Sequence, residues 1–273
     1  MNIEETIRIS ALEPGKDDYI DEDGLLHCGI CHEPKEAFYL PELRRPGWEK
    51  HPCECKCQRE KREAEEKEHR DYLHRSKVRD LKGKCFPSKT MENWTFDNCI
   101  LEEKKICFGE KYTENWTEIE RGNYGLLLWG PVGTGKTYFA ACIANALIEK
   151  ETPVRMTNLS AVMNCGFGER EDFIRDLCRA RLLIIDDFGM ERDTSYGLET
   201  VFQIIDRRFV QRKPLILTTN LSLKTLEKPS DLEHQRIYDR VLEMTVPVAF
   251  TGNSLRPGIS KDKKKKLDEI LNR

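Results

Sequence analysis

From residue 124 onward, short apolar runs alternate with longer segments whose apolar residues recur at helical spacing. The apolar runs predict four strands buried on both faces: Tyr124 to Gly130, Pro153 to Asn158, Arg181 to Asp186 and Pro214 to Asn220. The segments between them predict helices at Lys136 to Lys150, Glu169 to Ala180 and Tyr196 to Gln211. Strands alternating with helices predict an α/β fold with a parallel sheet covered by helices.

The chain before residue 124 has a different pattern. Between Arg59 and Lys82 it carries nine basic and seven acidic residues and almost no apolar ones, which predicts a solvated helix ended by Gly83. The aromatic, turn-rich segment Phe86 to Asn98 is expected to link it to the sheet. We therefore expect an N-terminal region at 1–83, a second domain at 84–258 whose residues 84–118 lead into it, and a mobile basic tail at 259–273.

Composition narrows the protein class. The chain has 273 residues, 38% of them hydrophobic, enough for the core of one large or two modest domains. No apolar run approaches the about 20 residues that cross a bilayer, and the N-terminus MNIEETIRIS lacks the basic and then apolar pattern of a signal peptide. We expect a cytoplasmic protein without a membrane partner. Its net charge of −3 gives no global indication of nucleic-acid binding.

Eleven cysteines in such a chain favour metal binding or burial over disulfides. Six are scattered and are interpreted as small buried hydrophobic residues: Cys85, Cys99, Cys107, Cys142, Cys165 and Cys178. Cys28 and Cys31 form a C-x-x-C pair, and CECKC supplies three more at positions 53, 55 and 57. This set predicts a Zn²⁺ knuckle with four thiolates.

Three cysteines compete for two of the zinc positions. Cys55 and Cys57 are favoured because CKCQRE continues into the charged helix, whereas Cys53 with Cys57 has the more comfortable spacing. The substitutes are His27, His32 and His51. So small a region cannot hold its shape by core burial alone, and zinc would supply folding energy.

Residues 130–137, GPVGTGKT, match G-x-x-x-x-G-K-[ST] in full, between a predicted strand and a predicted helix. Glycines let the backbone wrap around phosphates, and amides at a helix N-terminus attract negative charge. Lys136 should reach the β- and γ-phosphates of ATP, and Thr137 should offer its hydroxyl to Mg²⁺. The expected nucleotide contacts are Gly130, Pro131, Val132, Gly133, Thr134, Gly135, Lys136 and Thr137.

Two adjacent carboxylates, Asp186 and Asp187, end the third apolar run. Their mutual repulsion is relieved if a metal ion lies at the end of that strand. We expect this strand to run beside the phosphate loop, with Asp186 on magnesium and Asp187 polarising an attacking water.

The fourth strand ends in a polar residue, Asn220. The strand order is that of P-loop ATPases with an inserted strand, in which a polar residue next to the acidic strand contacts water and the γ-phosphate. The alternative is that Thr218, Thr219 and Asn220 only end a strand and begin a turn.

Taken together, these segments resemble the AAA+ ATPases of the DnaC-type helicase loaders and their IstB-like transposition-helper relatives. The resemblance runs from about Phe86 to Gly258 and is carried by GLLLWGPVGTGKT, LLIIDDFGMERDTSYGLETVFQIIDRRF, PLILTTNLSL, HQRIYDRVLEM and FTGNSLR. The cysteine knuckle followed by a charged helix is similar to the N-terminal part of loaders from phages and Gram-positive bacteria.

The resemblance implies roles for individual residues. It makes 130–137 the Walker A loop, Asp186 and Asp187 the Walker B acids, and Asn220 sensor 1. It makes Arg240 an arginine finger acting on a neighbouring subunit, with Arg236 one helical turn earlier as substitute, and Arg256 the sensor 2 arginine. The shorter Asp187, where most AAA+ proteins have Glu, implies slow hydrolysis. Without the resemblance, the three arginines would equally suit surface ion pairs.

Three functions follow as hypotheses. The first is an ATPase that loads the replicative helicase, binds single-stranded DNA and self-associates through its ATPase domain. The second is a transposition helper with the same chemistry and another partner. The third is a metabolic P-loop kinase, disfavoured because the sequence has no arginine-rich lid. The zinc region favours the loader.

Overall fold

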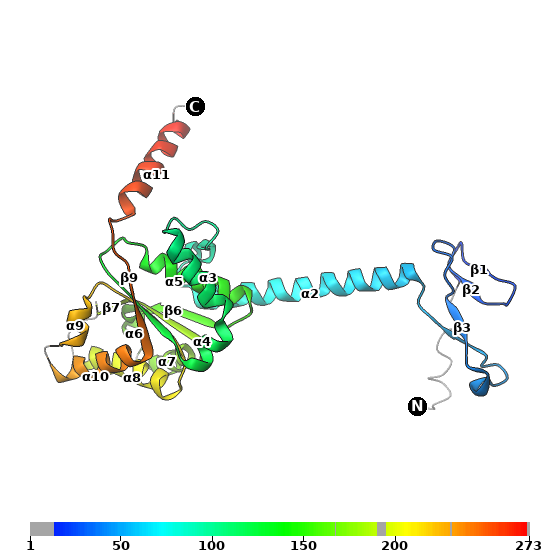
Figure 1. Ribbon diagram of the computed structural model, residues 1–273, viewed down its shortest axis with the longest axis horizontal. Helices are drawn as coiled ribbons and strands as arrows, with labels where there is room; N and C mark the ends of the chain where they lie inside the picture. Colours follow the sequence, from blue (N-terminus) through cyan, green and yellow to red (C-terminus); the bar gives the residue numbers. More distant parts are fainter. Residues whose placement is uncertain (1–13, 167, 190–194, 230, 272–273) are drawn as a thin grey trace. The chain divides into compact units, whose positions relative to one another are not determined.

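The computed structural model describes residues 14–166, 168–189, 195–229 and 231–271, and the chain divides into two compact units between Arg75 and Ser76. The polar N-terminal segment 1–10 and the MERDT part of the acidic motif, residues 190–194, lie outside the described residues. Figure 1 labels many of the helices and strands of both units.

The first unit contains two small antiparallel ladders. β1 (Tyr19–Ile20) pairs with β2 (Leu26–His27), and β3 (Glu36–Phe38) pairs with β4 (Lys50–Pro52). A short 3-10 helix, η1 (Pro41–Leu43), lies in the loop between β3 and β4. The segment between the two cysteine groups is therefore a hairpin.

The charged segment forms α2 (Lys56–Cys85), which confirms the predicted helix. Opposite charges pair at i,i+4, as between Arg62 and Glu66 at 2.8 Å. The predicted end at Gly83 was wrong. The buried side chains of Val78 and Cys85 pack into the core of the second unit and extend the helix past Gly83, whose cost within a helix is only about 1 kcal/mol.

The second unit is built on a five-stranded sheet of order β6-β7-β8-β5-β9, in which every neighbouring pair is parallel. The four predicted strands are confirmed as β5 (Gly125–Trp129), β6 (Val154–Asn158), β7 (Leu182–Phe188) and β8 (Leu215–Thr219). The edge strand β9 (Thr245–Ala249) was not predicted, because Pro247 and half-exposed positions interrupt its apolar pattern.

The end of the acidic strand β7 lies beside the phosphate loop, as expected, because Thr137 bonds to Asp186 at 2.8 Å. β8, not the acidic strand β7, pairs with β5, and β7 pairs with β8 on its other side. Because all five strands are parallel, their carboxyl ends still meet at one edge of the sheet, where the candidate site residues lie.

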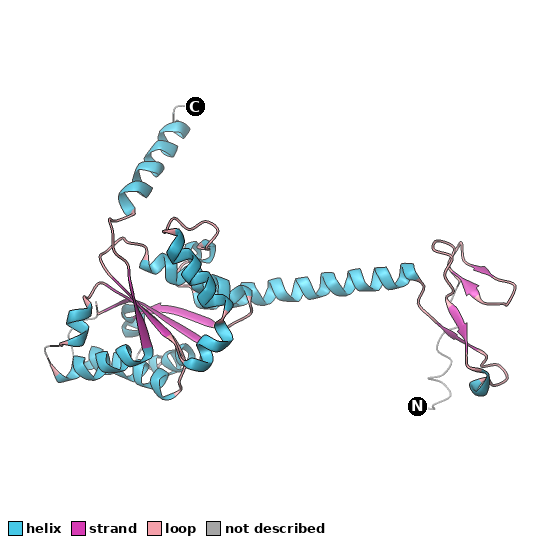
Figure 2. Cartoon of the chain, viewed as in Figure 1, coloured by secondary structure: helices cyan, strands magenta, loops and turns pink. Residues whose placement is uncertain are grey.

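Helices cover both faces of the sheet, as Figure 2 shows. The three predicted helices are confirmed as α5 (Lys136–Glu149), α7 (Arg170–Arg179) and α8 (Ser195–Val210). The other elements are η2 (Lys89–Asn93), α3 (Glu103–Glu114), α4 (Trp116–Gly122), α6 (Leu159–Asn164), α9 (Leu223–Glu227) and α10 (Leu232–Met244). Side chains of α5 pack on one face of the sheet and those of α8 and α10 on the other.

The C-terminal segment, expected as a basic tail, lies in a helix, α11 (Arg256–Leu271). Lysine is a good helix former, so a lysine-rich stretch after a turn can form a helix.

Candidate nucleotide site

The phosphate loop joins β5 to α5 and is covered by the segment after β9. Gly130 has φ 142° and Gly133 has φ 85°, a backbone region that disfavours side chains. A Cβ at Gly130 would also meet the carbonyl oxygen of Phe250, and one at Gly133 would meet Ser254. The amide of Leu255 donates to Gly133 O at 2.9 Å. These two glycines therefore serve both the loop and the close approach of residues 250–255.

Lys136, the first residue of α5, connects the loop to the end of β8. Its Nζ donates to Gly130 O at 2.8 Å, to Pro131 O at 2.7 Å and to Asn220 Oδ1 at 2.9 Å. Burial lowers the pKa of Lys136, and the nearby carboxylates of Asp187 and Asp186 oppose that shift. The structure thus brings Lys136 and Asn220 together, as expected if both face the same phosphates.

Asp186 lies at the centre of a hydroxyl cluster. Thr137 Oγ1 and Thr218 Oγ1 donate to its Oδ1 at 2.8 Å and 2.6 Å. Burial raises the pKa of Asp186, and these hydrogen bonds act against the shift. Neighbouring ligands of an octahedral Mg²⁺ with 2.1 Å bonds are about 3 Å apart, so the Thr137 and Asp186 oxygens fit one such ion.

Asp187 is separated from Asp186 by the backbone. It has φ 54°, and the pairing of β7 with β8 shifts register between Ile185 and Phe188. As a result, Asp186 is largely buried while the adjacent Asp187 is exposed and lines the cleft. This bulge directs the two consecutive carboxylates into different surroundings, which reduces the electrostatic repulsion between them.

Thr218 was not predicted as a site residue. Its fully buried hydroxyl donates to Asp186 and accepts from the amide of Asp187 at 2.9 Å, so one side chain on β8 orients both acids. The sequence signal was the polar pair Thr218 and Thr219 within an otherwise apolar strand.

The phosphate loop, Asp187 and the covering segment line a cleft of about 240 Å³. Its polar side includes Lys136, Thr137, Asp187, Asn220 and Arg256, and its apolar side includes Trp94, Ile100, Leu101, Tyr138 and Leu255. The rings of Trp94 and Tyr138 stack with centroids 5.0 Å apart. A lining that combines polar groups with aromatic and aliphatic side chains suits a nucleotide, which has charged phosphates and a planar base. Trp94, which lies in the predicted linker, was missed as a site residue.

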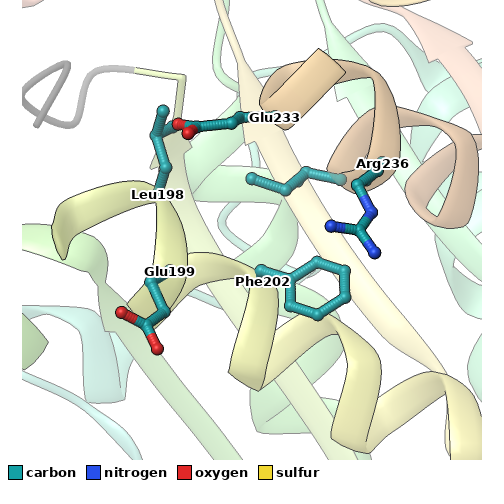
Figure 3. A pocket seen from close by; sticks show the side chains of 6 residues that line it. Leu198, Glu199, Phe202, Glu233 and Arg236 are labelled. Atoms are coloured by element: carbon teal, nitrogen blue, oxygen red, sulfur yellow. The ribbon is translucent and has the colours of Figure 1, made fainter. Parts of the chain in front are cut away.

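Arg256 thus lies in the cleft, but Arg236 and Arg240 are not among the residues that line it. Arg236 lines a separate pocket of about 270 Å³ between α8 and α10, with its guanidinium 5.6 Å from the ring centre of Phe202 (Figure 3). Arg240 lies 4.6 Å from the same ring and pairs with Asp206 at 2.9 Å.

In the first unit, the C-x-x-C pair and the CECKC segment lie close together. The sulfurs of Cys28, Cys31 and Cys55 lie within 4.8 Å of one another. The thiol of Cys57 hydrogen-bonds with Cys31 and Cys28, and the amides of Cys57 and Glu33 help lower the pKa of Cys31 to about 6. Tetrahedral zinc with four thiolates has sulfurs about 3.8 Å apart, so this grouping fits the ion.

The remaining candidate ligands have other partners. Cys53 donates to Pro34 O at 3.3 Å. His27 contacts Asp21 at 2.8 Å and His32 O at 3.0 Å, and His51 Nδ1 lies 3.2 Å from Pro52 O. Among the described residues, the group that could hold a metal contains only cysteines. In the same residues, no helix is long and apolar enough to cross a membrane.

The parallel sheet, with β8 inserted beside the phosphate-loop strand, defines a P-loop protein with the fold of an AAA+ ATPase domain. The sequence pattern of the IstB-like ATP binding protein family matches residues 58–265. Because this match covers more than half of the chain, the protein belongs to that family of ATP-binding proteins.

The relatives similar to this chain include a replicative helicase loader and an ATP-binding protein of an insertion sequence. The chain is 27% identical over 179 residues to the replicative helicase loader DnaC of Escherichia coli K12, a match covering 62% of this chain and 71% of DnaC. It is 29% identical over 139 residues to an ATP-binding protein in an insertion sequence of Mycobacterium tuberculosis, covering 48% of this chain and 55% of that protein. A solved structure of DnaI aligns with TM-score 0.54 and 17% identity, over 64% of this chain and 98% of that one.

Proposed function

We propose that this protein is an ATPase that acts in DNA replication as a helicase loader. The observation that carries the ATPase part is that Lys136, Thr137 and Asn220 line one cleft, with Asp186 bonded to Thr137 beside it. Lys136 would bind the β- and γ-phosphates, and Thr137 and Asp186 would hold Mg²⁺, which neutralises phosphate charge when bound. Trp94 and the apolar side of the cleft would receive the base.

The remaining site residues would act on the γ-phosphate and water. Asp187 lines the cleft with no protein cation bonded to it in the described contacts, which suits a base that orients water. Asn220, freed from Lys136 by the arriving phosphates, would hold the same water or the γ-phosphate. Arg256 would add positive charge from the covering segment. The shorter reach of Asp187 would keep hydrolysis slow.

Loading is proposed from the named relatives together with the first unit. The match to DnaC supports a replicative helicase as partner, and we assign its binding to the N-terminal region 1–83, with 84–258 as the ATPase domain and 259–273 as a basic extension. Self-association through the ATPase domain and binding of single-stranded DNA complete the proposal. The relative in an insertion sequence favours a second candidate, a transposition helper. The kinase hypothesis is left without support from any relative reported above.

The experiment for the partner mixes the purified chain with the host replicative helicase, with and without ATP and Mg²⁺, and measures the mass of the complex by light scattering. A loader should form a stable complex through the N-terminal region, and removal of residues 1–75, which leaves the buried Val78 in place, should abolish it. A chain that ignores the helicase but associates with the transposase and DNA of an insertion sequence would instead establish the helper function.

We also predict that the cysteine cluster of the first unit binds zinc. We expect one Zn²⁺ per chain, bound by Cys28, Cys31, Cys55 and Cys57, because their thiols converge. Metal analysis of purified protein should show one atom per chain, which Cys55→Ser should remove. Cys53→Ser is the matched control, because Cys53 bonds to a backbone carbonyl and should leave the zinc in place. Equal loss in both variants would reject this ligand set.

A further inference from the structure

Of the described residues of the C-terminal helix α11, only the first, Arg256, lines the nucleotide cleft. The helix carries six basic and three acidic residues, a net charge of +3 in a chain of net charge −3. Lys261, Lys264 and Lys265 are exposed, and so are Leu267 and Ile270 toward the helix end. In Figure 1, α11 is the red helix that follows β9.

The spacing of its charges fits an extended polyanion. Lys261, Lys264 and Lys265 stand at i, i+3 and i+4 and so share one helix face. The sequence of this segment also contains four consecutive lysines, residues 263–266, which interrupt any apolar stripe along it. A helix that lies in a membrane surface needs a wide, uninterrupted apolar face, which this pattern does not provide. The charge arrangement therefore favours a phosphate backbone over a lipid surface.

The helix is attached directly to the nucleotide cleft. Phe250 N donates to Trp129 O at 2.8 Å and Leu255 N to Gly133 O at 2.9 Å, so residues 250–255 lie along the phosphate loop. The next residue, Arg256, lines the cleft and begins α11. A γ-phosphate that fixed Arg256 would therefore also fix the start of the lysine-rich helix.

We propose that α11 binds the phosphate backbone of single-stranded nucleic acid, and that nucleotide in the cleft strengthens this binding through residues 250–256. The inference rests on the DNA binding proposed above and assigns it to a surface. Ion pairing between lysines and phosphates releases condensed counterions, so each lysine that contacts a phosphate leaves a measurable salt dependence.

The test uses the full chain and a fluorescent oligodeoxythymidylate, with affinity measured by anisotropy across a salt series. The variant Lys264→Gln/Lys265→Gln removes two charges and keeps helix propensity, because glutamine is also a good helix former. We expect weaker binding and a log–log salt slope smaller by about 1.4, at roughly 0.7 per phosphate contact. The control Lys104→Gln/Lys111→Gln removes two exposed lysines of α3 and should change the slope far less.

This experiment distinguishes a failure of the α11 assignment from a failure of the proposed DNA binding. If the parent binds the oligonucleotide and the α11 variant binds it equally, or if the α3 control loses as much, the inference is wrong while DNA binding stands. If the parent binds no oligonucleotide, the DNA part of the proposed function fails as well. Binding of the parent to phosphatidylserine vesicles, lost in the α11 variant, in the absence of oligonucleotide binding would identify a membrane surface instead.

A second measurement tests whether nucleotide binding in the cleft and oligonucleotide binding by α11 strengthen each other. A non-hydrolysable ATP analogue with Mg²⁺ should tighten oligonucleotide binding by the parent about 5-fold or more, and the oligonucleotide should tighten analogue binding by the same factor. The α11 variant should lose this mutual effect while it keeps its analogue affinity without DNA. Equal oligonucleotide affinity with and without the analogue would show that α11 does not respond to the cleft.

Discussion

Lys136→Ala is expected to lose ATP binding. In the structure its Nζ is held by two loop carbonyls and Asn220, all at the position where the β- and γ-phosphates would lie. Truncating one partner of a buried charge pair costs about 2–5 kcal/mol, or about 30-fold to several-thousand-fold in Kd. Isothermal titration with Mg²⁺ and ATP measures the loss directly, and circular dichroism checks that the fold is retained.

The matched variant is Asp187→Asn, which changes the neighbouring acid without removing the magnesium ligand. It should keep the ATP affinity of the parent and lose hydrolysis by about 10²- to 10⁴-fold, the range of a general base. This split follows from the bulge, which places Asp186 in the hydroxyl cluster and Asp187 in the cleft. Unchanged ATP affinity in Lys136→Ala, or joint loss of binding and hydrolysis in Asp187→Asn, would contradict the assignment of roles.

The sequence predicted the strands and the polar residues of the cleft well because their signals are local. Gly130 to Thr137 form a contiguous motif, Asp186 directly follows an apolar run, and Asn220 follows an apolar run that ends in two threonines. The carboxyl ends of parallel strands necessarily share one edge, so these residues meet whichever strands are neighbours.

What the sequence missed depends on contacts between distant segments. Thr218 gains its role from a register shift in β7, 31 residues away from it at Asp187. Trp94 enters the cleft only because η2 packs beside α5, where Asn145 donates to the carbonyls of Met91 and Trp94 at 2.9 Å. Neither contact has a periodic or motif signal. The edge strand β9 lacked one too, since Pro247 stands in its centre.

The contacts of Arg240 within one chain do not place it at the nucleotide, although the family resemblance implies that it is an arginine finger. It does not line the cleft; its guanidinium lies between Asp206 at 2.9 Å and the rings of Phe202 and Phe209. The pair is partly exposed and contributes only about 0–1 kcal/mol to stability. Among the described residues that line the cleft, Lys136 and Arg256 are the cations, and a neighbouring molecule is one source of a further cation for the leaving γ-phosphate.

Two variants separate a catalytic role of Arg240 from a structural one. As a finger acting on the neighbour's ATP, Arg240→Ala should bind ATP normally and lose about 10³- to 10⁵-fold in kcat. Asp206→Ala breaks the same ion pair but keeps the arginine, so it should retain most of the activity. If the two variants lose activity equally, the ion pair itself is what matters and Arg240 is structural.

Mixing inactive Arg240→Ala with inactive Lys136→Ala should restore activity. In a head-to-tail assembly, half of the phosphate loops are intact and half of the neighbouring arginines are intact, so roughly one interface in four should be complete in an equal mixture. Steady-state ATP hydrolysis should therefore recover to about a quarter of the parent rate, and activity per chain in the parent should rise with protein concentration because the complete site needs two molecules. Arg236→Ala mixed with Lys136→Ala tests the substitute one helical turn earlier in the same way. A mixture that stays inactive although light scattering shows mixed oligomers would exclude a shared site, because every such oligomer contains intact loops facing intact arginines.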